Sequence, residues 1–177
     1  MVKQGLGVIK YFAYGSNMLE KKLKDRCSSA EKINPSEGSQ HMIRKYRFRF
    51  HKKSSDGSAK CDARKTGDTS DIVYGVLFSI NDEQIGALNK FEGLDKGYEN
   101  KVVNVIDEKS SNEIPALIYY AIDVDPTLKP YDWYKRQTVK GARDNGLPEE
   151  YVKGIEAFAS KTDEDEDRRK KAERLLE

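Results

Sequence analysis

The sequence predicts an α+β domain built on a mixed, mostly antiparallel β-sheet, closed or nearly closed into a barrel, with helices packed outside. Two observations predict this class. Strand-like segments dominate residues 8–122, and helix-like segments dominate the residues that follow. The chain has 177 residues, a length that suits one domain, and we expect residues 1–160 to form it.

The first half of the domain alternates predicted strands with short connections. Residues 8–14 are rich in β-branched and aromatic side chains and run into Gly-Ser-Asn, which predicts a buried strand that ends in a turn. Residues 19–26 predict a short helix. Residues 40–51 alternate aromatic with basic side chains, which predicts one half-buried strand with a basic outer face. The polar, glycine-containing residues 52–70 predict a loop, in which a short strand around Cys61 is left open.

A second buried strand leads into an amphipathic helix. The apolar run of residues 72–80 predicts the strand. Asn81 is a suitable first residue for the helix that follows it. Ile85, Leu88 and Phe91 recur every third residue, so we expect the three side chains to form the buried stripe of this helix.

The remaining elements are two strands and two helices. Residues 101–106 and 114–122 predict strands joined by a polar turn. A helical pattern begins at Tyr131 and ends at Asn145-Gly146, a typical C-terminal cap. Pro148 suits the first turn of a further helix.

Charged residues make up 35% of the chain, but they balance to a formal net charge of only +2. Bulk attraction to nucleic acid or to an anionic membrane is therefore not expected. Residues 161–177 hold 13 charged side chains in 17 positions, which predicts a charged terminal helix or a frayed, solvated tail rather than a partner-binding motif. No apolar run reaches the roughly 18 residues of a membrane span, and the start of the chain does not resemble a signal peptide. With just two cysteines, Cys27 and Cys61, we expect a cytoplasmic protein with free thiols.

Several site classes are disfavoured. His41, His51 and the two cysteines show no metal-ligand spacing, and the chain has no phosphate-binding GKS or GKT motif. Ser16 lacks the glycine that a nucleophile elbow needs two residues later. The aromatic and basic residues of 44–53 are the best nucleic-acid candidate, although the alternation places the two types on opposite faces.

Two segments carry the chemistry. The first strand ends in Tyr14-Gly15-Ser16-Asn17, where a glycine lets the backbone approach a ligand and successive amides can hold a carboxylate or an oxyanion. Glu92 ends the amphipathic helix directly before Gly93. A carboxylate beside the apolar stripe of a helix can be partly buried, and burial raises its pKa toward the range of a general base.

Together these segments resemble the γ-glutamylcyclotransferase family, also described as AIG2-like, over most of residues 8–158. Glu92, followed by Gly97-Tyr98, is similar to the catalytic glutamate of the family. Residues 134–148 are similar to the C-terminal helix and turn of its glutathione-pathway branch, in which the tyrosine matching Tyr134 contacts substrate. The resemblance implies that the substrate-binding residues are Tyr11, Phe12, Ala13, Tyr14, Gly15, Ser16, Asn17, Tyr98 and Tyr134.

The resemblance implies a reaction without cofactor or metal, in which a γ-glutamyl amino acid or peptide cyclises to 5-oxoproline and releases its amine. Glu92 would act as general acid and base, and the loop from Tyr14 to Asn17 would bind substrate. The expected partner is this small molecule, with no nucleic acid and no membrane, and a homodimer is allowed. Two alternatives stay open: a γ-glutamylamine cyclotransferase, and a non-catalytic small-molecule or nucleic-acid binding module on the same fold.

Overall fold

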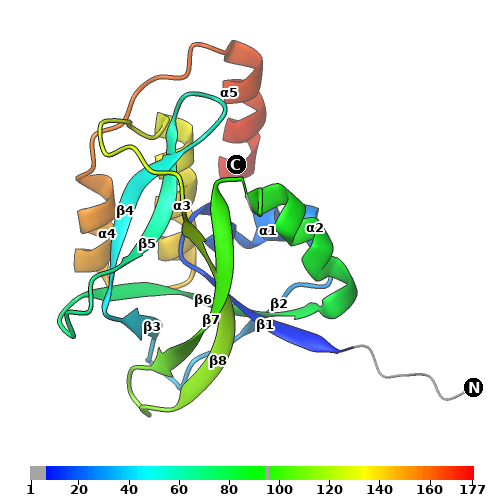
Figure 1. Cartoon of the computed structure of the whole chain (residues 1–177), viewed down its shortest axis with the longest axis vertical. Helices are drawn as coiled ribbons and strands as arrows, with labels where there is room; N and C mark the ends of the chain where they lie inside the picture. The colour runs from blue at the N-terminus through cyan, green and yellow to red at the C-terminus, as the bar shows by residue number, and fades with distance from the viewer. Residues whose placement is uncertain (1–6, 95) are drawn as a thin grey trace, which may run out of the picture.

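The computed structural model of the chain describes residues 7–94 and 96–177 (Figure 1). Residues 1–6, the start of the predicted domain, therefore lie outside the described part. Two short 3₁₀ turns, η1 (Ser16–Met18) and η2 (Arg174–Leu176), accompany the main elements. In chain order these are β1 (Val8–Ala13), α1 (Glu20–Arg26), β2 (Glu31–Ile33), β3 (His41–Arg44), β4 (Tyr46–Lys53), β5 (Ala59–Lys65), β6 (Ile72–Asn81), α2 (Asp82–Glu92), β7 (Tyr98–Asp107), β8 (Glu113–Ala121), α3 (Asp132–Asp144), α4 (Glu149–Glu156) and α5 (Glu166–Glu173).

The central sheet closes on itself. β1 pairs antiparallel with β6 from Val8 to Ala13, and β6 pairs in turn with β3. β3 pairs with β7, β7 with β8, and β8 returns to β1 in a parallel pairing of Leu117 with Tyr11. β2 extends the open edge of β6. The helices lie around this ring (Figure 1). The predicted α+β class with a mixed, nearly closed sheet is therefore confirmed.

The single strand predicted over residues 40–51 is wrong, because this stretch forms two strands in two sheets. β3 belongs to the barrel, whereas β4 pairs with β5 in a separate hairpin. Lys45 lies between them in the left-handed region, with φ of 71°, and its N–H donates to the Asp71 carbonyl over 2.8 Å. The alternation does hold on β4, where Phe48 and Phe50 are buried. A left-handed residue redirects the chain without interrupting the alternation, so hydropathy does not reveal it.

The predicted loop over residues 52–70 contains a full strand. β5 pairs with β4 from Tyr46↔Lys65 to Lys53↔Ala59, with one irregularity near Phe50. Its inward residues are Ala59, Cys61 and Ala63, all buried. Small side chains between charged ones carry a weak strand signal, because β-propensity comes mainly from branched and aromatic residues.

Helix α2 buries less of itself than its periodicity predicts. Leu88 is buried, but Phe91 is 58% exposed, so the predicted buried stripe is wrong at its last position. The guanidinium of Arg26 lies over the Phe91 ring, 5.0 Å from its centre. Asn81 occupies the N-cap position, although its side chain makes no capping hydrogen bond. The Phe91 side chain therefore lies at the exposed end of α2, over Arg26 of α1, rather than in the core.

The charged C-terminal segment is attached to the domain at two points. The Asp163 side chain is buried and accepts a hydrogen bond from Trp133 Nε1 over 2.8 Å. The carbonyl of Ala172, in α5, accepts one from Gln137 Nε2 over 2.9 Å. Both donors belong to α3, against which α5 packs. Most of the charged side chains of this segment are exposed, as expected, but the backbone is not a frayed tail.

None of the helices in the described ranges is both long and apolar enough to cross a membrane.

Candidate active site

A cavity of about 290 Å³ opens between the barrel, the β4–β5 hairpin and α3. The end of β1 and the turn after it form one wall, and the ends of α1 and α2 form the next. The hairpin and the first turn of α3 complete it. The lining residues are Tyr11, Tyr14, Gly15, Ser16, Asn17, Lys22, Arg26, Lys52, Ser54, Asp56, Lys60, Cys61, Phe91, Glu92, Tyr98, Tyr119, Trp133 and Tyr134.

The turn after β1, from Gly15 to Asn17, lines this cavity. Within residues 7–94 and 96–177, the backbone N–H groups of Gly15, Ser16 and Asn17 donate to no protein acceptor. The turn is held from behind, because the N–H of Met18 donates to the Gly15 carbonyl over 3.0 Å. A Cβ on Gly15 would lie 3.0 Å from both Cβ and Sγ of Cys61. A larger residue at position 15 would therefore crowd β5. The amides of the turn are available to an anion.

Glu92 lies at one end of a short chain of hydrogen bonds, with Asn17 in its middle. Asn17 Nδ2 donates to Glu92 Oε1 over 2.9 Å, and Asn17 Oδ1 accepts from Arg26 Nη1 over 3.1 Å. The first hydrogen bond connects the two predicted motifs, which lie 75 residues apart in sequence. Burial raises the pKa of the Glu92 carboxyl, even though Arg26 and Lys22 act to lower it. A carboxylate with a raised pKa in a cavity has the properties of a proton acceptor that can also return the proton.

Tyrosines form much of the cavity wall. Tyr98 donates from its hydroxyl to the Cys61 carbonyl over 2.5 Å, and the Tyr134 hydroxyl accepts from the Cys61 amide over 3.2 Å. The two rings thereby fix the middle of β5 against the cavity. Burial raises the pKa of both phenols well above its ordinary value, so both stay protonated at neutral pH.

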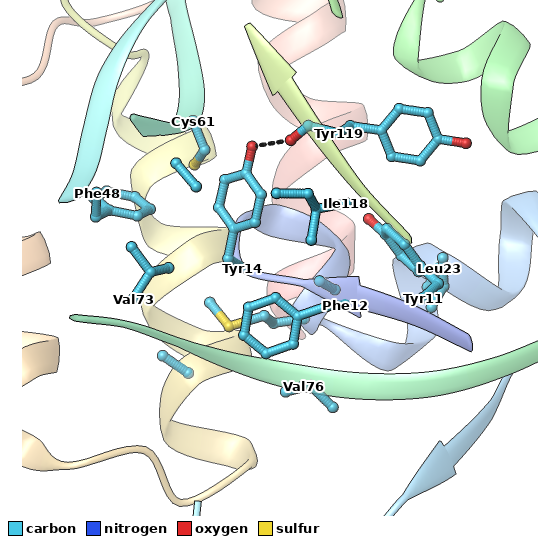
Figure 2. Packing of buried hydrophobic residues seen from close by; sticks show 14 of the residues in the cluster. Tyr11, Phe12, Tyr14, Leu23, Phe48, Cys61, Val73, Val76, Ile118 and Tyr119 are labelled. Carbon is cyan, nitrogen blue, oxygen red and sulfur yellow. Dashed lines mark hydrogen bonds between the residues drawn. The ribbon is translucent and has the colours of Figure 1, made fainter. Parts of the chain in front are cut away.

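Seven of the nine residues that the resemblance assigns to substrate binding line the cavity, together with Glu92. Phe12 and Ala13 do not; both are fully buried in the core. Figure 2 shows Phe12 on the side of β6, near Val76, whereas Tyr14 points toward β8 and donates its hydroxyl hydrogen to the Tyr119 carbonyl. Alternation along β1 turns Phe12 to the side opposite Tyr11, and Tyr14 lies beyond the end of the strand, where its direction is not set by that alternation.

Comparisons with known proteins identify the chain. Residues 72–155 match the model of the AIG2-like family. A γ-glutamylcyclotransferase of Bos taurus is 28% identical over 160 residues, which cover 84% of this chain and 77% of that protein. A γ-glutamylcyclotransferase of Mus musculus is 30% identical over 177 residues, covering 94% of this chain and 90% of that protein. The chain belongs to the γ-glutamylcyclotransferase family.

A solved structure described as a γ-glutamyl cyclotransferase supports the assignment. It superposes with a TM-score of 0.77 at 26% sequence identity, covering 93% of this chain and 99% of that one. This family member is an enzyme of the γ-glutamyl cyclotransferase type.

The sequence motifs shared with the γ-glutamylcyclotransferase family did not predict that basic side chains would line the cavity. Four lysine and arginine side chains line it: Lys22, Arg26, Lys52 and Lys60. In the sequence they are scattered among 32 lysines and arginines, so their convergence carries no local signal. A weak signal was present at Lys60, a cation between the small, inward-facing residues of β5. Among the described residues, no group of three or more His, Cys, Asp or Glu side chains is placed to hold a metal ion.

Lys22 is the most buried of these cations. Its Nζ donates to Ser16 Oγ over 2.9 Å and to Gln137 Oε1 over 2.7 Å. Burial lowers the pKa of Lys22 to about 7, and the positive charges of Arg26 and Lys60 add to this effect. Gln137 also donates to the Ala172 carbonyl, so a continuous set of hydrogen bonds runs from α5 to the turn after β1.

Proposed function

We propose that this protein cyclises a γ-glutamyl amino acid or peptide to 5-oxoproline and releases the amino acid or peptide as an amine. Glu92 is the general acid and base in this proposal, and the loop from Tyr14 to Asn17 binds the substrate. The observation that carries the proposal is the hydrogen bond between Asn17 and Glu92, which joins a carboxyl group of raised pKa to the turn after β1 in one cavity.

The state of the second cavity carboxylate supports the choice of Glu92. Asp56 accepts hydrogen bonds from Lys60 Nζ over 2.9 Å and from Ser58 Oγ over 2.6 Å. Although burial acts to raise it, these bonds hold the pKa of Asp56 well below its ordinary value. A carboxylate with so low a pKa is a weak base. Glu92, with its raised pKa, is the better proton acceptor.

The reaction needs two kinds of help from the cavity. The free amides of Gly15, Ser16 and Asn17 suit either the α-carboxylate of the glutamyl group or the oxyanion that forms at its γ-carbon. The walls of Tyr98 and Tyr134 would hold the glutamyl chain curled, with its α-nitrogen near the γ-carbonyl. Since nucleophile and electrophile belong to one molecule, correct positioning supplies a large part of the rate.

Glu92 would move protons between the two nitrogens. The substrate enters with three protons on its α-nitrogen. Loss of protons to Glu92 lets this nitrogen form a bond to the γ-carbon, and the carbon-nitrogen bond of the γ-amide then breaks. One proton stays on the lactam nitrogen, and two are transferred to the leaving nitrogen, which departs as an ammonium group. The carboxylate is thereby regenerated, and no other reactant is consumed.

The test is to incubate the protein with γ-glutamyl dipeptides and γ-glutamyl amines while 5-oxoproline is measured. We expect lactam from the dipeptides. Glu92→Gln keeps the size of the side chain but removes the base, so kcat should fall roughly 10²- to 10⁴-fold. Glu83→Gln is the matched control: Glu83 is exposed in the first turn of the same helix, and its replacement should leave turnover unchanged.

Each alternative has its own outcome. Lactam from γ-glutamyl amines alone would assign a γ-glutamylamine cyclotransferase. Absence of lactam from every substrate would leave a binding module. Turnover by Glu92→Gln equal to that of the unmodified protein would show that another group is the base.

A further inference from the structure

The cavity carries more positive than negative side chains. Lys22, Arg26, Lys52 and Lys60 line it together with two carboxylates, although the chain as a whole is nearly balanced. Because the pKa of Lys22 is lowered to about 7, this side chain is only partly charged at neutral pH, but the other three cations still outnumber the two carboxylates. A γ-glutamyl compound with a neutral amino acid as leaving group has two carboxylates and one ammonium. With an acidic leaving group it has a third carboxylate, and with a simple amine it has one. The excess of positive charge therefore matches the most anionic of these compounds best.

Three of the four cations already have partners. Lys60 pairs with Asp56 over 2.9 Å. Lys22 and Arg26 donate to protein oxygens, as described above. Lys52 differs from them: in the ranges 7–94 and 96–177 its Nζ donates to no residue and lies within 4 Å of no carboxylate oxygen.

Lys52 is nevertheless held in place. Its Nζ lies 4.7 Å from the centre of the Tyr98 ring, at a distance typical of a cation–π contact. Its end also packs on Gly97, where an added Cβ would come within 2.7 Å of Lys52 Cε. Tyr98 in turn contacts the carbonyl of Cys61, so the ring under the lysine is fixed. The side chain is half-buried, and its ammonium faces the cavity that holds Glu92.

We propose that this cavity prefers γ-glutamyl compounds whose leaving group carries an additional carboxylate, such as an acidic amino acid, and that Lys52 binds this carboxylate. The inference rests on the proposed cyclotransferase function and adds the substrate class and a specificity-determining residue. The cavity lining supports the assignment, because Lys52 lines the same cavity as Glu92 and Asp56. Burial lowers the pKa of Lys52, whereas the negative charges of Glu92, Asp123 and Asp56 act to raise it. Lys52 belongs to β4 of the hairpin, in the wall of the cavity that holds Glu92, and is placed to contact the part of the substrate that leaves.

The experiment compares two substrates of nearly equal shape, γ-glutamylglutamate and γ-glutamylglutamine. In the unmodified protein, we expect kcat/KM to be roughly tenfold higher for γ-glutamylglutamate, the factor of one charge-assisted hydrogen bond. Lys52→Gln should bring the ratio near one, mainly through a higher KM for the acidic compound. Lys52→Arg keeps the charge and should retain most of the preference. Lys53→Gln is the matched control, since Lys53 is exposed, lies outside the cavity lining and pairs with Asp123 over 3.4 Å.

The two proposals fail in different ways. Equal turnover of both compounds by the unmodified protein, or a preference that survives Lys52→Gln, would overturn the role of Lys52 and leave the cyclotransferase function intact. If neither compound yields 5-oxoproline, the proposed function fails. Calorimetric affinities of the same two compounds for the unmodified protein and for Lys52→Gln would then still decide whether Lys52 recognises the additional carboxylate.

Discussion

Asp163 is the residue through which the C-terminal segment can be tested most directly. Its side chain is fully shielded from solvent. It accepts hydrogen bonds from Trp133 Nε1 over 2.8 Å, from Arg168 Nε over 2.7 Å and from the Asp165 amide over 3.0 Å. Asp163→Asn preserves the shape and removes the charge. We expect the variant to be less stable, because Arg168 then loses its buried anionic partner.

The pKa of Asp163 sets the size of the effect. The hydrogen bond from Arg168 lowers it to about 2, from an ordinary value of 3.8. At 1.36 kcal/mol for each pKa unit, the folded state gains about 2 kcal/mol from the ionised carboxylate. A pKa lowered by folding means that this contribution is complete above pH 4 to 5 and is lost as the pH falls toward 2. Asp163→Asn should therefore lower the free energy of unfolding by about 2 kcal/mol at pH 7, or Tm by roughly 4–8 °C.

Urea unfolding at several pH values from 7 to 3 measures this directly. Trp133 is the single tryptophan of the chain, so its fluorescence reports the contact itself, and circular dichroism reports the whole domain. The difference between Asp163→Asn and the unmodified protein should shrink below pH 4. Glu164→Gln is the control: this exposed neighbour should change stability by less than about 0.5 kcal/mol. Equal stabilities at pH 7, or a difference that does not depend on pH, would refute the reasoning.

Three further predictions concern the cavity wall. Folding lowers the pKa of Lys22 to about 7. Between pH 7 and pH 10 the unfolded chain therefore binds more protons at this lysine than the folded protein does, so the free energy of unfolding should rise with pH in this range. Lys22→Met should remove up to about 4 kcal/mol of this rise, measured by urea unfolding at pH 7 and 10. An equal rise in the free energy of unfolding for the variant and the unmodified protein would contradict the lowered pKa of Lys22. Gly15→Ala should cost about 1–3 kcal/mol, since its Cβ would lie 3.0 Å from both Cβ and Sγ of Cys61. Cys61→Ala removes Sγ but keeps Cβ, so in a double-mutant cycle it should restore part of this loss; no restoration at all would contradict the steric explanation. Tyr14→Phe should cost roughly 1–2 kcal/mol in thermal unfolding, because the Tyr119 carbonyl loses its donor; an unchanged Tm would show that the bond adds no stability.

The two segments singled out from the sequence come together, but the reason is visible only in three dimensions. Glu92 ends its helix directly before Gly93, which has the left-handed conformation of a C-terminal cap, with φ of 64°. That much follows from local composition. The hydrogen bond from Asn17 depends on where α2 ends relative to β1, and the antiparallel pairing of β1 with β6, directly before α2, determines that.

Most strands and helices of the barrel follow from hydrophobic periodicity, because a strand or a helix must bury one face and the residues of that face recur regularly. The exceptions share a physical cause. Lys45 redirects the chain through backbone conformation, the inward face of β5 is built from small residues, and Phe91 lies where the helix leaves the core. None of these features changes the local pattern of polar and apolar residues.

By itself, the sequence determined the fold class, most of the elements and the family, since these depend on periodicity and on short motifs that are continuous in the chain. The tertiary structure alone decided which of 32 basic residues surround Glu92, that Lys52 has no partner among the described residues, and that Asp163 anchors the charged terminus. The physical reason is that charge and burial at these positions depend on contacts between residues far apart in the chain. Such contacts exist only after the barrel has closed and α3 has packed against it.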